Sequence, residues 1–304
     1  MLAKGRLLGV QFNALFENDL YLEFVINLMG GGIILRNYRV PTLTIAGSDS
    51  SGGAGIQADL KTFSAIGTYG MSVITAVTAQ NTEGVFAVEE LSGEIIKSQI
   101  KAIFDDIEPA AVKIGMVSSP EIIVDIVNTM KKYNPSFLVV DPVMISKSGY
   151  SLLKSEAKEN LIKYLIPMAY LVTPNVPEAE EITGIKINSV TDMKVAGKKI
   201  FELGPKFVLV KGGHLDGEAV DVLMGENIFE VFETKRINRK NTHGTGCTIS
   251  SAITAYLALG YGIKEAVELS KKYITEAIEH SFDIGHGVGP VHHFYKFEGL
   301  IFSK

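Results

Sequence analysis

Short, continuous apolar runs recur along the chain from residue 41 onward. Five of them are rich in β-branched and aromatic side chains; they are T-L-T-I-A (42–46), A-V-K-I-G (111–115), F-L-V-V-D (137–141), A-Y-L-V-T (169–173) and F-V-L-V-K (207–211). Runs without polar alternation are typical of strands that are covered on both faces. We therefore expect these segments to form the strands of one buried sheet.

Helical spacing separates these runs. Isoleucines at 96, 100, 103 and 107 follow at helical intervals, a second apolar face extends over 263–278, and a third covers 248–259 with Gly260 as a plausible stop. Strands and helices in alternation indicate βαβ units with right-handed crossovers. The predicted fold is α/β, with a mostly parallel, doubly wound central sheet flanked by helices on both faces.

The first forty residues do not follow this alternation. Their apolar run F-V-I-N-L-M-G-G-G-I-I-L (24–35) is interrupted by glycines and is too short to span a bilayer. Glu17, Asp19 and Glu23 break the hydrophobic region that a signal peptide needs. We predict an N-terminal extension over 1–40, or a misassigned start with Met29 as the initiator, followed by one domain over 41–304.

Composition narrows the classes of partner. The formal net charge of −5 and the pI near 5.8 leave no basic surface for nucleic acid. A single cysteine excludes an internal disulfide and favours a reducing cytoplasm. We expect no nucleic-acid partner and no membrane attachment.

Unusual residues follow directly after the apolar runs. The segments are G-S-D-S-S-G-G-A-G (47–55), G-M (115–116), D-P-V-M (141–144), T-P-N-V-P-E (173–178) and K-G-G-H (211–214). In open α/β sheets the carboxyl ends of the strands form the ligand crevice, so five loops converge on one site. Their glycine spacing fits neither the dinucleotide fingerprint nor a Walker A loop. A phosphate site here would be of another type.

The segment N-T-H-G-T-G-C-T (241–248) precedes the helical face over 248–259. Glycines at the start of a helix let backbone N–H groups approach an anion, and the helix dipole adds positive charge there. The same dipole would lower the pKa of Cys247, enabling its thiol to orient or deprotonate a substrate hydroxyl. The alternative is an inert, buried cysteine.

Together with A-Q-N-T (79–82) and G-P-V-H-H-F (289–294), these motifs resemble the hydroxymethylpyrimidine/phosphomethylpyrimidine kinases of thiamine biosynthesis, members of the ribokinase-like superfamily. The resemblance covers about residues 41–295. It implies ATP- and Mg²⁺-dependent phosphorylation of 4-amino-5-hydroxymethyl-2-methylpyrimidine and then of its monophosphate. It further implies that the partners are this small pyrimidine and ATP, and that the enzyme is a cytoplasmic homodimer.

The resemblance also assigns roles to residues. On the substrate side, Gln80 would read the aminopyrimidine edge, Asp59 would be the substrate-side aspartate, and the ring faces would be lined by Gly47, Ala54, Met116 and Val143. On the nucleotide side, Lys211 would reach the ATP phosphates beside Thr173, Asn175 and Gly213, while Asp141 and Glu178 would arrange Mg²⁺ through water. Catalysis would fall to Lys211 and to an anion hole of Gly244, Gly246 and Cys247.

Alternatives remain at several of these positions. Gln80 could be an exposed loop amide, Met116 plain core and Lys211 a solvated surface charge. Most ribokinase relatives have an aspartate where this chain has Cys247, which argues against a sugar kinase and leaves a pyridoxal or pyridoxine kinase open. A catalytically silent pyrimidine-binding regulator is a further alternative. His286, His292 and His293 match no zinc-ligand spacing and have no assigned role.

Overall fold

The computed structural model describes residues 2–7, 10–15, 40–144, 155–215 and 217–298. The apolar run over 24–35 and Met29 lie outside the described residues. Contacts divide the chain into two units, residues 1–38 and 39–304. The first unit contains an antiparallel pair of strands, β1 (Leu2–Leu7) and β2 (Val10–Leu15). The extension predicted over 1–40 remains a prediction.

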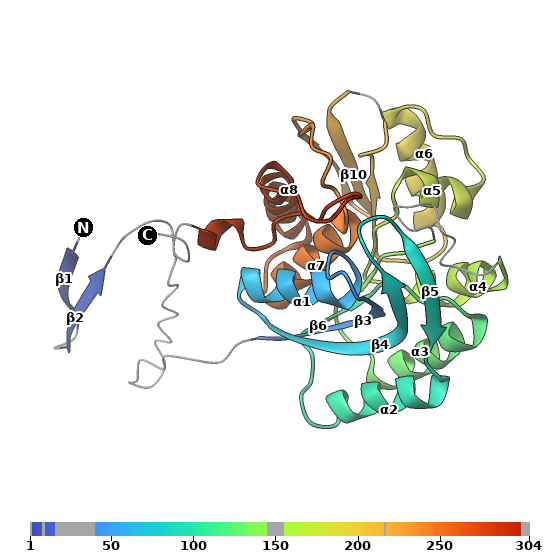
Figure 1. The fold of residues 1–304 in the computed structure, drawn as a ribbon, viewed down its shortest axis with the longest axis horizontal. Helices are drawn as coiled ribbons and strands as arrows, with labels where there is room; N and C mark the ends of the chain where they lie inside the picture. The colour runs from blue at the N-terminus through green and yellow to red at the C-terminus, as the bar shows by residue number, and fades with distance from the viewer. Residues whose placement is uncertain (1, 8–9, 16–39, 145–154, 216, 299–304) are drawn as a thin grey trace. The chain divides into compact units, whose positions relative to one another are not determined.

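The second unit is built on a sheet that, among the described residues, has nine strands in the order β11-β10-β9-β8-β7-β6-β3-β4-β5 (Figure 1). The parallel part consists of β3 (Pro41–Asp49), β4 (Tyr69–Gln80), β6 (Ala111–Ile114), β7 (Leu138–Val140), β8 (Leu171–Val172) and β9 (Phe207–Lys211). Antiparallel strands β5 (Val85–Glu90), β10 (Ala219–Gly225) and β11 (Ile228–Thr234) close the two edges. The predicted mostly parallel sheet is confirmed.

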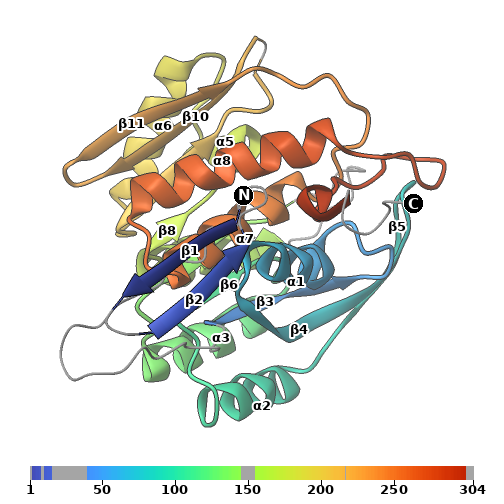
Figure 2. The same ribbon diagram turned by 90° about the vertical axis from the view of Figure 1, so that its left-hand side faces the viewer.

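Helices cover both faces of this sheet, as predicted (Figure 2). One face carries α1 (Gly55–Ile66), α7 (Thr245–Ala258) and α8 (Ile263–Glu279). The other carries α2 (Gly93–Phe104), α3 (Pro120–Tyr133), α4 (Ser155–Asn160), α5 (Val176–Thr183) and α6 (Val190–Phe201), with the short turns η1 (Leu161–Leu165) and η2 (Ile166–Met168). A last turn, η3 (Tyr295–Phe297), follows α8. Within the part of the chain that the structure describes, no helix combines the length and the apolar character required to cross a membrane.

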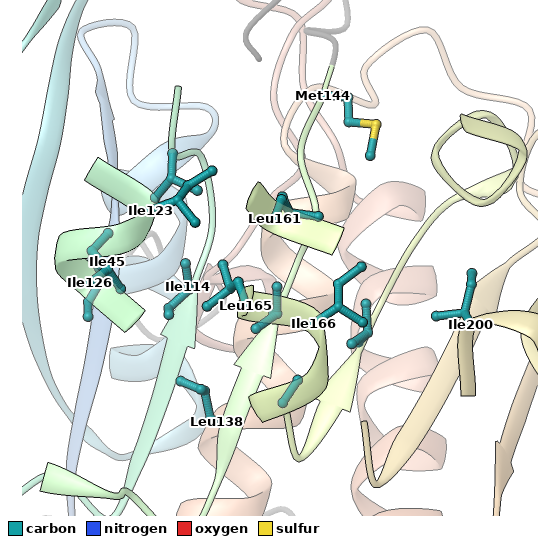
Figure 3. Packing of buried hydrophobic residues seen from close by; sticks show 14 of the residues in the cluster. Ile45, Ile114, Ile123, Ile126, Leu138, Met144, Leu161, Leu165, Ile166 and Ile200 are labelled. Carbon is teal, nitrogen blue, oxygen red and sulfur yellow. The ribbon is translucent and has the colours of Figure 1, made fainter. Parts of the chain in front are cut away.

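Two hydrophobic clusters explain why the strand runs are apolar without a break. In β9, Val208 and Val210 pack into the cluster beneath α2, α3 and α6, whereas Phe207 and Leu209 pack into the cluster beneath α7 and α8. Figure 3 shows the first cluster, where strand and helix side chains interlock. Because successive side chains of a strand point to opposite faces, a strand buried on both sides has few polar positions, and those it has, such as Thr44 and Lys113, are hydrogen-bonded.

The segment after α8 holds the start of α7 in place. His293 lies buried, its Nε2 is 3.0 Å from Thr248 Oγ1, and its carbonyl oxygen accepts a hydrogen bond from Tyr273. Upstream, Pro290 pairs with His243 in an isolated bridge. One of the three unassigned histidines therefore has a structural role. Burial, with smaller contributions from Lys61 and His292, lowers the pKa of His293 to about 3.

This buried histidine predicts a loss of stability in mild acid. The folded pKa lies below the unfolded value near 6.5, so the unfolded chain takes up a proton that the folded chain does not as the pH falls below about 6.5. We expect His293→Gln to remove about 2 kcal/mol of the decrease in unfolding free energy between pH 7 and pH 5. Urea titrations at both pH values measure it. The exposed His280→Gln is the control and should behave like the unmodified chain.

Candidate active site

A cavity of about 610 Å³ opens at the carboxyl ends of the parallel strands. All five loops expected there contribute to its lining, with Gly47, Met116, Val143, Asn175 and Gly213 each coming from a different loop. Further predicted residues that line it are Ala54, Gln80, Asp141, Glu178, Lys211, Gly244, Gly246 and Cys247. Thirteen of the fifteen predicted site residues thus share one cavity; Asp59 and Thr173 do not line it.

The start of α7 forms one wall of this cavity. Gly244 caps the helix with φ 79°, and a Cβ there would lie 1.8 Å from the carbonyl oxygen of Gly53. Gly246 follows two residues later, where a Cβ would lie 3.6 Å from Lys211 Nζ. The predicted helix start is confirmed, and Gly244 to Cys247 at this start line the cavity.

Lys211 reaches the same wall from the end of β9. Its Nζ donates to Asp141 Oδ1 over 2.8 Å, and its side chain is 11 % exposed. Thr173 donates to the same carboxylate oxygen, and Ser250 of α7 donates to the other over 3.2 Å. Burial alone would lower the pKa of Lys211, but Asp141 and Glu178 outweigh it and raise the pKa. Lys211 is therefore a fixed cation and not a solvated surface charge.

Glu178 completes this charged group from the first turn of α5. Its carboxylate accepts from the Asn175 backbone N–H over 2.8 Å, while the Asn175 side chain accepts from the Glu178 N–H, which makes a capping box. Burial raises the pKa of Glu178 to about 7, with Lys211 opposing and Asp141 adding to the rise. Two carboxylates and one ammonium group thus stand in front of the helix start.

Cys247 lies in the first turn of α7 and lines the cavity. The prediction of a lowered pKa is wrong. Burial raises the pKa of the thiol to about 11, and Lys113, which favours the thiolate, offsets only part of this. The carboxylates of Asp59 and Asp141 add to the rise. Desolvation outweighs the charge that the helix start provides, so the thiol is neutral at pH 7.

The predicted role of Asp59 in substrate contact is not supported by its position. Asp59 is fully buried in α1, and both of its carboxylate oxygens lie 2.8 Å from Lys113 Nζ. Thr44 and Ser251 donate to the remaining acceptor positions over 2.6 Å. An aspartate saturated in this way has no lone pair left for a ligand. It holds β3, β6, α1 and α7 together beneath the cavity.

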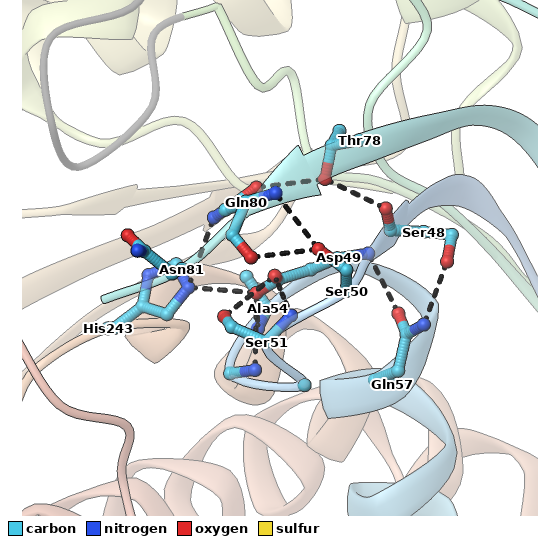
Figure 4. A network of polar contacts seen from close by, with 12 residues as sticks. Ser48, Asp49, Ser50, Ser51, Ala54, Gln57, Thr78, Gln80, Asn81 and His243 are labelled. Atoms are coloured by element: carbon cyan, nitrogen blue, oxygen red, sulfur yellow. Dashed lines mark hydrogen bonds and ion pairs between the residues drawn. The ribbon is translucent and has the colours of Figure 1, made fainter. Parts of the chain in front are cut away.

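Gln80, which also lines the cavity, belongs to a polar network around the glycine loop (Figure 4). Asp49 accepts from the Gly53 and Ala54 backbone N–H groups and lies 2.9 Å from His243 Nε2. The Gln80 side chain lies between His243 and Thr78. Burial, which would raise the pKa of Asp49, is outweighed by the hydrogen bonds from His243, Ser51 and Ala54, so the pKa is lowered.

Sequence reasoning assigned no role to Asp49, Lys113 or His243, although all three line the cavity. Lys113 had a readable signal, because it interrupts the continuous apolar run A-V-K-I-G and a lysine buried on both faces needs an anionic partner. His243 stands inside the N-T-H-G-T-G-C segment, but only the tertiary structure brings it to the glycine loop. Among the described residues, no group of three or more histidine, cysteine, aspartate or glutamate side chains is placed to hold a metal ion.

Comparison with known proteins gives consistent matches. The family model for phosphomethylpyrimidine kinase matches residues 49–292. The hydroxymethylpyrimidine/phosphomethylpyrimidine kinase of Rhizobium meliloti is 50% identical over 258 residues, which are 84% of this chain and 97% of that one. The thiamine biosynthesis bifunctional protein ThiED of Geobacter sulfurreducens is 47% identical over 273 residues, and the matched part spans 88% of this chain but only 56% of that longer protein.

Solved structures agree. A phosphomethylpyrimidine kinase from Clostridium difficile is 74% identical with a TM-score of 0.72, covering 79% of this chain and 100% of its own. A pyridoxal kinase from Bacillus subtilis, solved as an ADP complex, is 41% identical with a TM-score of 0.79, covering 84% and 98%.

Proposed function

Because the chain belongs to the phosphomethylpyrimidine kinase family, we propose that it transfers the γ-phosphoryl group of ATP to 4-amino-5-hydroxymethyl-2-methylpyrimidine, and then to the monophosphate, in thiamine biosynthesis. It is a phosphotransferase with a ribokinase-like fold. The observation that carries the proposal is one cavity lined both by an amide reader, Gln80, and by a cationic glycine cradle, Lys211 with Gly244 and Gly246. A coupled ADP-release assay with the hydroxymethylpyrimidine, its monophosphate and pyridoxal tests it; absence of turnover of both pyrimidines would contradict it.

We assign stabilisation of the transferring phosphoryl group to residues that interact favourably with negative charge. In a loose transition state the migrating phosphoryl group bears its charge on oxygens, and fixed N–H groups and cations lower its energy. The start of α7 supplies the N–H groups and Lys211 supplies the cation. Desolvation in the cavity strengthens both, because fewer water dipoles screen them.

The residues present fit a Mg²⁺ ion held largely by water. Mg²⁺ prefers one or two carboxylates and several waters, and Asp141 and Glu178 are two cavity-lining carboxylates that interact with Lys211. When bound, the ion would neutralise phosphate charge. Its approach would favour the ionised form of Glu178, whose pKa near 7 otherwise leaves it partly protonated at neutral pH.

We assign Cys247 to orienting the acceptor hydroxyl, because a thiol with a pKa near 11 is already protonated at neutral pH and cannot act as a resting base. Cys247→Ala is expected to lower kcat by about 10²-fold, the low end for acid–base groups, since a loose transition state needs little deprotonation of the nucleophile. Iodoacetamide labelling of this single cysteine should accelerate only above the free-thiol pKa of about 8.5. Rapid labelling at pH 7 would contradict the assignment.

Gln80 is proposed to read the pyrimidine edge. Gln80→Leu is expected to raise KM for the hydroxymethylpyrimidine by about 10²-fold or more while KM for ATP changes little, because the ring loses two hydrogen bonds that the phosphates do not share. Initial rates over both substrate concentrations measure it. An unchanged pyrimidine KM would show that the ring binds elsewhere.

A pyridoxal kinase activity is the second candidate, favoured by the likeness to the Bacillus subtilis pyridoxal kinase. The pyridoxal arm of the ADP-release assay decides it. A catalytically silent pyrimidine-binding regulator is disfavoured, because the cationic glycine cradle would then have no use. We further propose that the enzyme is cytoplasmic and homodimeric, which size-exclusion chromatography with light scattering tests for the assembly.

A further inference from the structure

The amide of Gln80 is held on both flanks, and its neighbours determine which flank is the oxygen. Asp49 accepts hydrogen bonds from Ser51 through Oδ1 and from the Gly53 and Ala54 N–H groups through Oδ2. These donors keep the carboxylate ionised, so it can only accept. His243 Nε2, 2.9 Å from Oδ2, must therefore carry a proton.

The proton on His243 Nε2 also restricts the orientation of the Gln80 amide. One terminal atom of its amide lies 3.3 Å from the same His243 Nε2, and the other lies 3.2 Å from Thr78 Oγ1. A nitrogen facing His243 would set two N–H donors against each other. An oxygen facing His243 shares the single Nε2 proton with Asp49 Oδ2 in a bifurcated hydrogen bond, and the amide nitrogen then donates to Thr78 Oγ1, whose own proton goes to the Ser48 carbonyl over 3.0 Å. The two orientations of the amide occupy the same space, so they differ in energy only through their hydrogen bonds.

The His243 ring is fixed by close packing, so it cannot rotate away from Asp49 and Gln80. A Cβ on Gly53 would lie 2.3 Å from His243 Cδ2, which shows how closely the glycine loop packs against the ring. The His243 backbone N–H donates to Gly289 and its side chain is 10 % exposed. The proton on Nε2 is thus held at one place relative to β4.

An amide that is held on both flanks keeps one oxygen lone pair and one N–H for a ligand in the cavity. With the oxygen on the His243 side, this edge matches a ring that presents an exocyclic amino group to the oxygen and a ring nitrogen lone pair to the N–H. A 4-oxo ring in the same pose presents a carbonyl and a ring N–H in the same places, which sets acceptor against acceptor and donor against donor.

Given the proposed function, we propose that Asp49 and His243 fix the orientation of the Gln80 amide and thereby make the site selective for 4-aminopyrimidines over 4-oxopyrimidines. His243 acts as a positioning residue, through Gln80. Leucine in its place would leave the amide free to turn, so that either ring could be read.

The test compares kcat/KM for the hydroxymethylpyrimidine and for its 4-oxo analogue. The unmodified enzyme should favour the amino ring by about 10⁴-fold, since buried donors and acceptors would otherwise be left opposed. His243→Leu should lower this ratio at least about 10-fold, with KM for ATP unchanged, by allowing the turned amide. His243→Gln, whose side-chain N–H can take the place of Nε2–H, should restore the ratio.

An unchanged ratio in His243→Leu, or an equal loss in His243→Gln, overturns the inference. If thermal unfolding shows that His243→Leu does not fold, Thr78→Val decides, because it removes the partner on the other flank with little change of shape; a lowered ratio supports the inference and an unchanged one overturns it. Failure of the unmodified enzyme to phosphorylate the aminopyrimidine overturns the proposed function itself, whereas normal turnover with unaltered selectivity in the variants overturns only the role of His243.

Discussion

Gly244→Ala is expected to lower kcat by on the order of 10³-fold or more, comparable to the loss of a donor from an oxyanion hole. The residue has φ 79°, where an L side chain is strained, and its Cβ would lie 1.8 Å from the Gly53 carbonyl oxygen. Backbone cannot yield as a flexible side chain does, so either the glycine loop or the start of α7 must move. The N–H groups then no longer converge on the phosphate.

Gly260→Ala is the matched control for this substitution. Gly260 has φ 94°, but nothing lies within 4 Å of the position its Cβ would take. The free energy of unfolding of Gly260→Ala should therefore fall by about 1 to 2 kcal/mol because of backbone strain, while its kcat stays unchanged. Steady-state rates and urea unfolding of both variants separate the two effects. If both variants lost kcat alike, backbone strain and not the geometry of the cradle would be the cause.

Lys211→Met is expected to lower kcat by about 10² to 10³-fold and to raise KM for ATP, because methionine fills similar space without the charge. The variant also leaves Asp141 and Glu178 facing each other without a cation. Since Lys211 lowers the pKa of Glu178 and Asp141 raises it, that pKa should move upward from about 7. The acidic limb of the pH–rate profile should therefore shift to higher pH.

The exposed Lys97, paired with Asp125 on the surface, allows the same substitution as a control. Lys97→Met should change neither rates nor the pH profile, since an exposed ion pair contributes little and lies on α2, outside the cavity lining. Rates measured from pH 6 to pH 9 check both variants. Unaltered kcat and KM for ATP in Lys211→Met would remove Lys211 from the phosphate site.

The sequence predicted the parallel strands better than the edges of the sheet, for a physical reason. Continuous apolar runs identify strands that are buried on both sides, and all five of them appear. In contrast, β11 alternates half-buried and exposed residues and packs at an edge, and β4 is rich in alanine, threonine and serine. Such strands bury little apolar area on one or both faces, so they carry a weak signal until their partners are known.

The placement of site residues in one cavity could be predicted where the signal is local, and not where it depends on neighbours. The glycines at the start of α7 open a helix and Lys211 ends an apolar run, whereas Gln80 was assigned only through the family resemblance. The pKa of Cys247 could not be predicted from the sequence, because desolvation depends on all the residues that surround the thiol in the folded chain. Likewise, only the structure shows that Asp59 is saturated by Lys113, Thr44 and Ser251, segments that are distant in the sequence.

The contact between Asp49 and His243 joins residues 194 positions apart. Closing so long a loop costs entropy that only the rest of the domain can offset, so the two halves of the cavity meet late in folding. During synthesis the glycine loop emerges long before the start of α7, and the site cannot exist on a chain that still lacks its last quarter. A ligand that bridges Gln80 and the cradle would bind only the finished domain, and would stabilise it against unfolding by mass action.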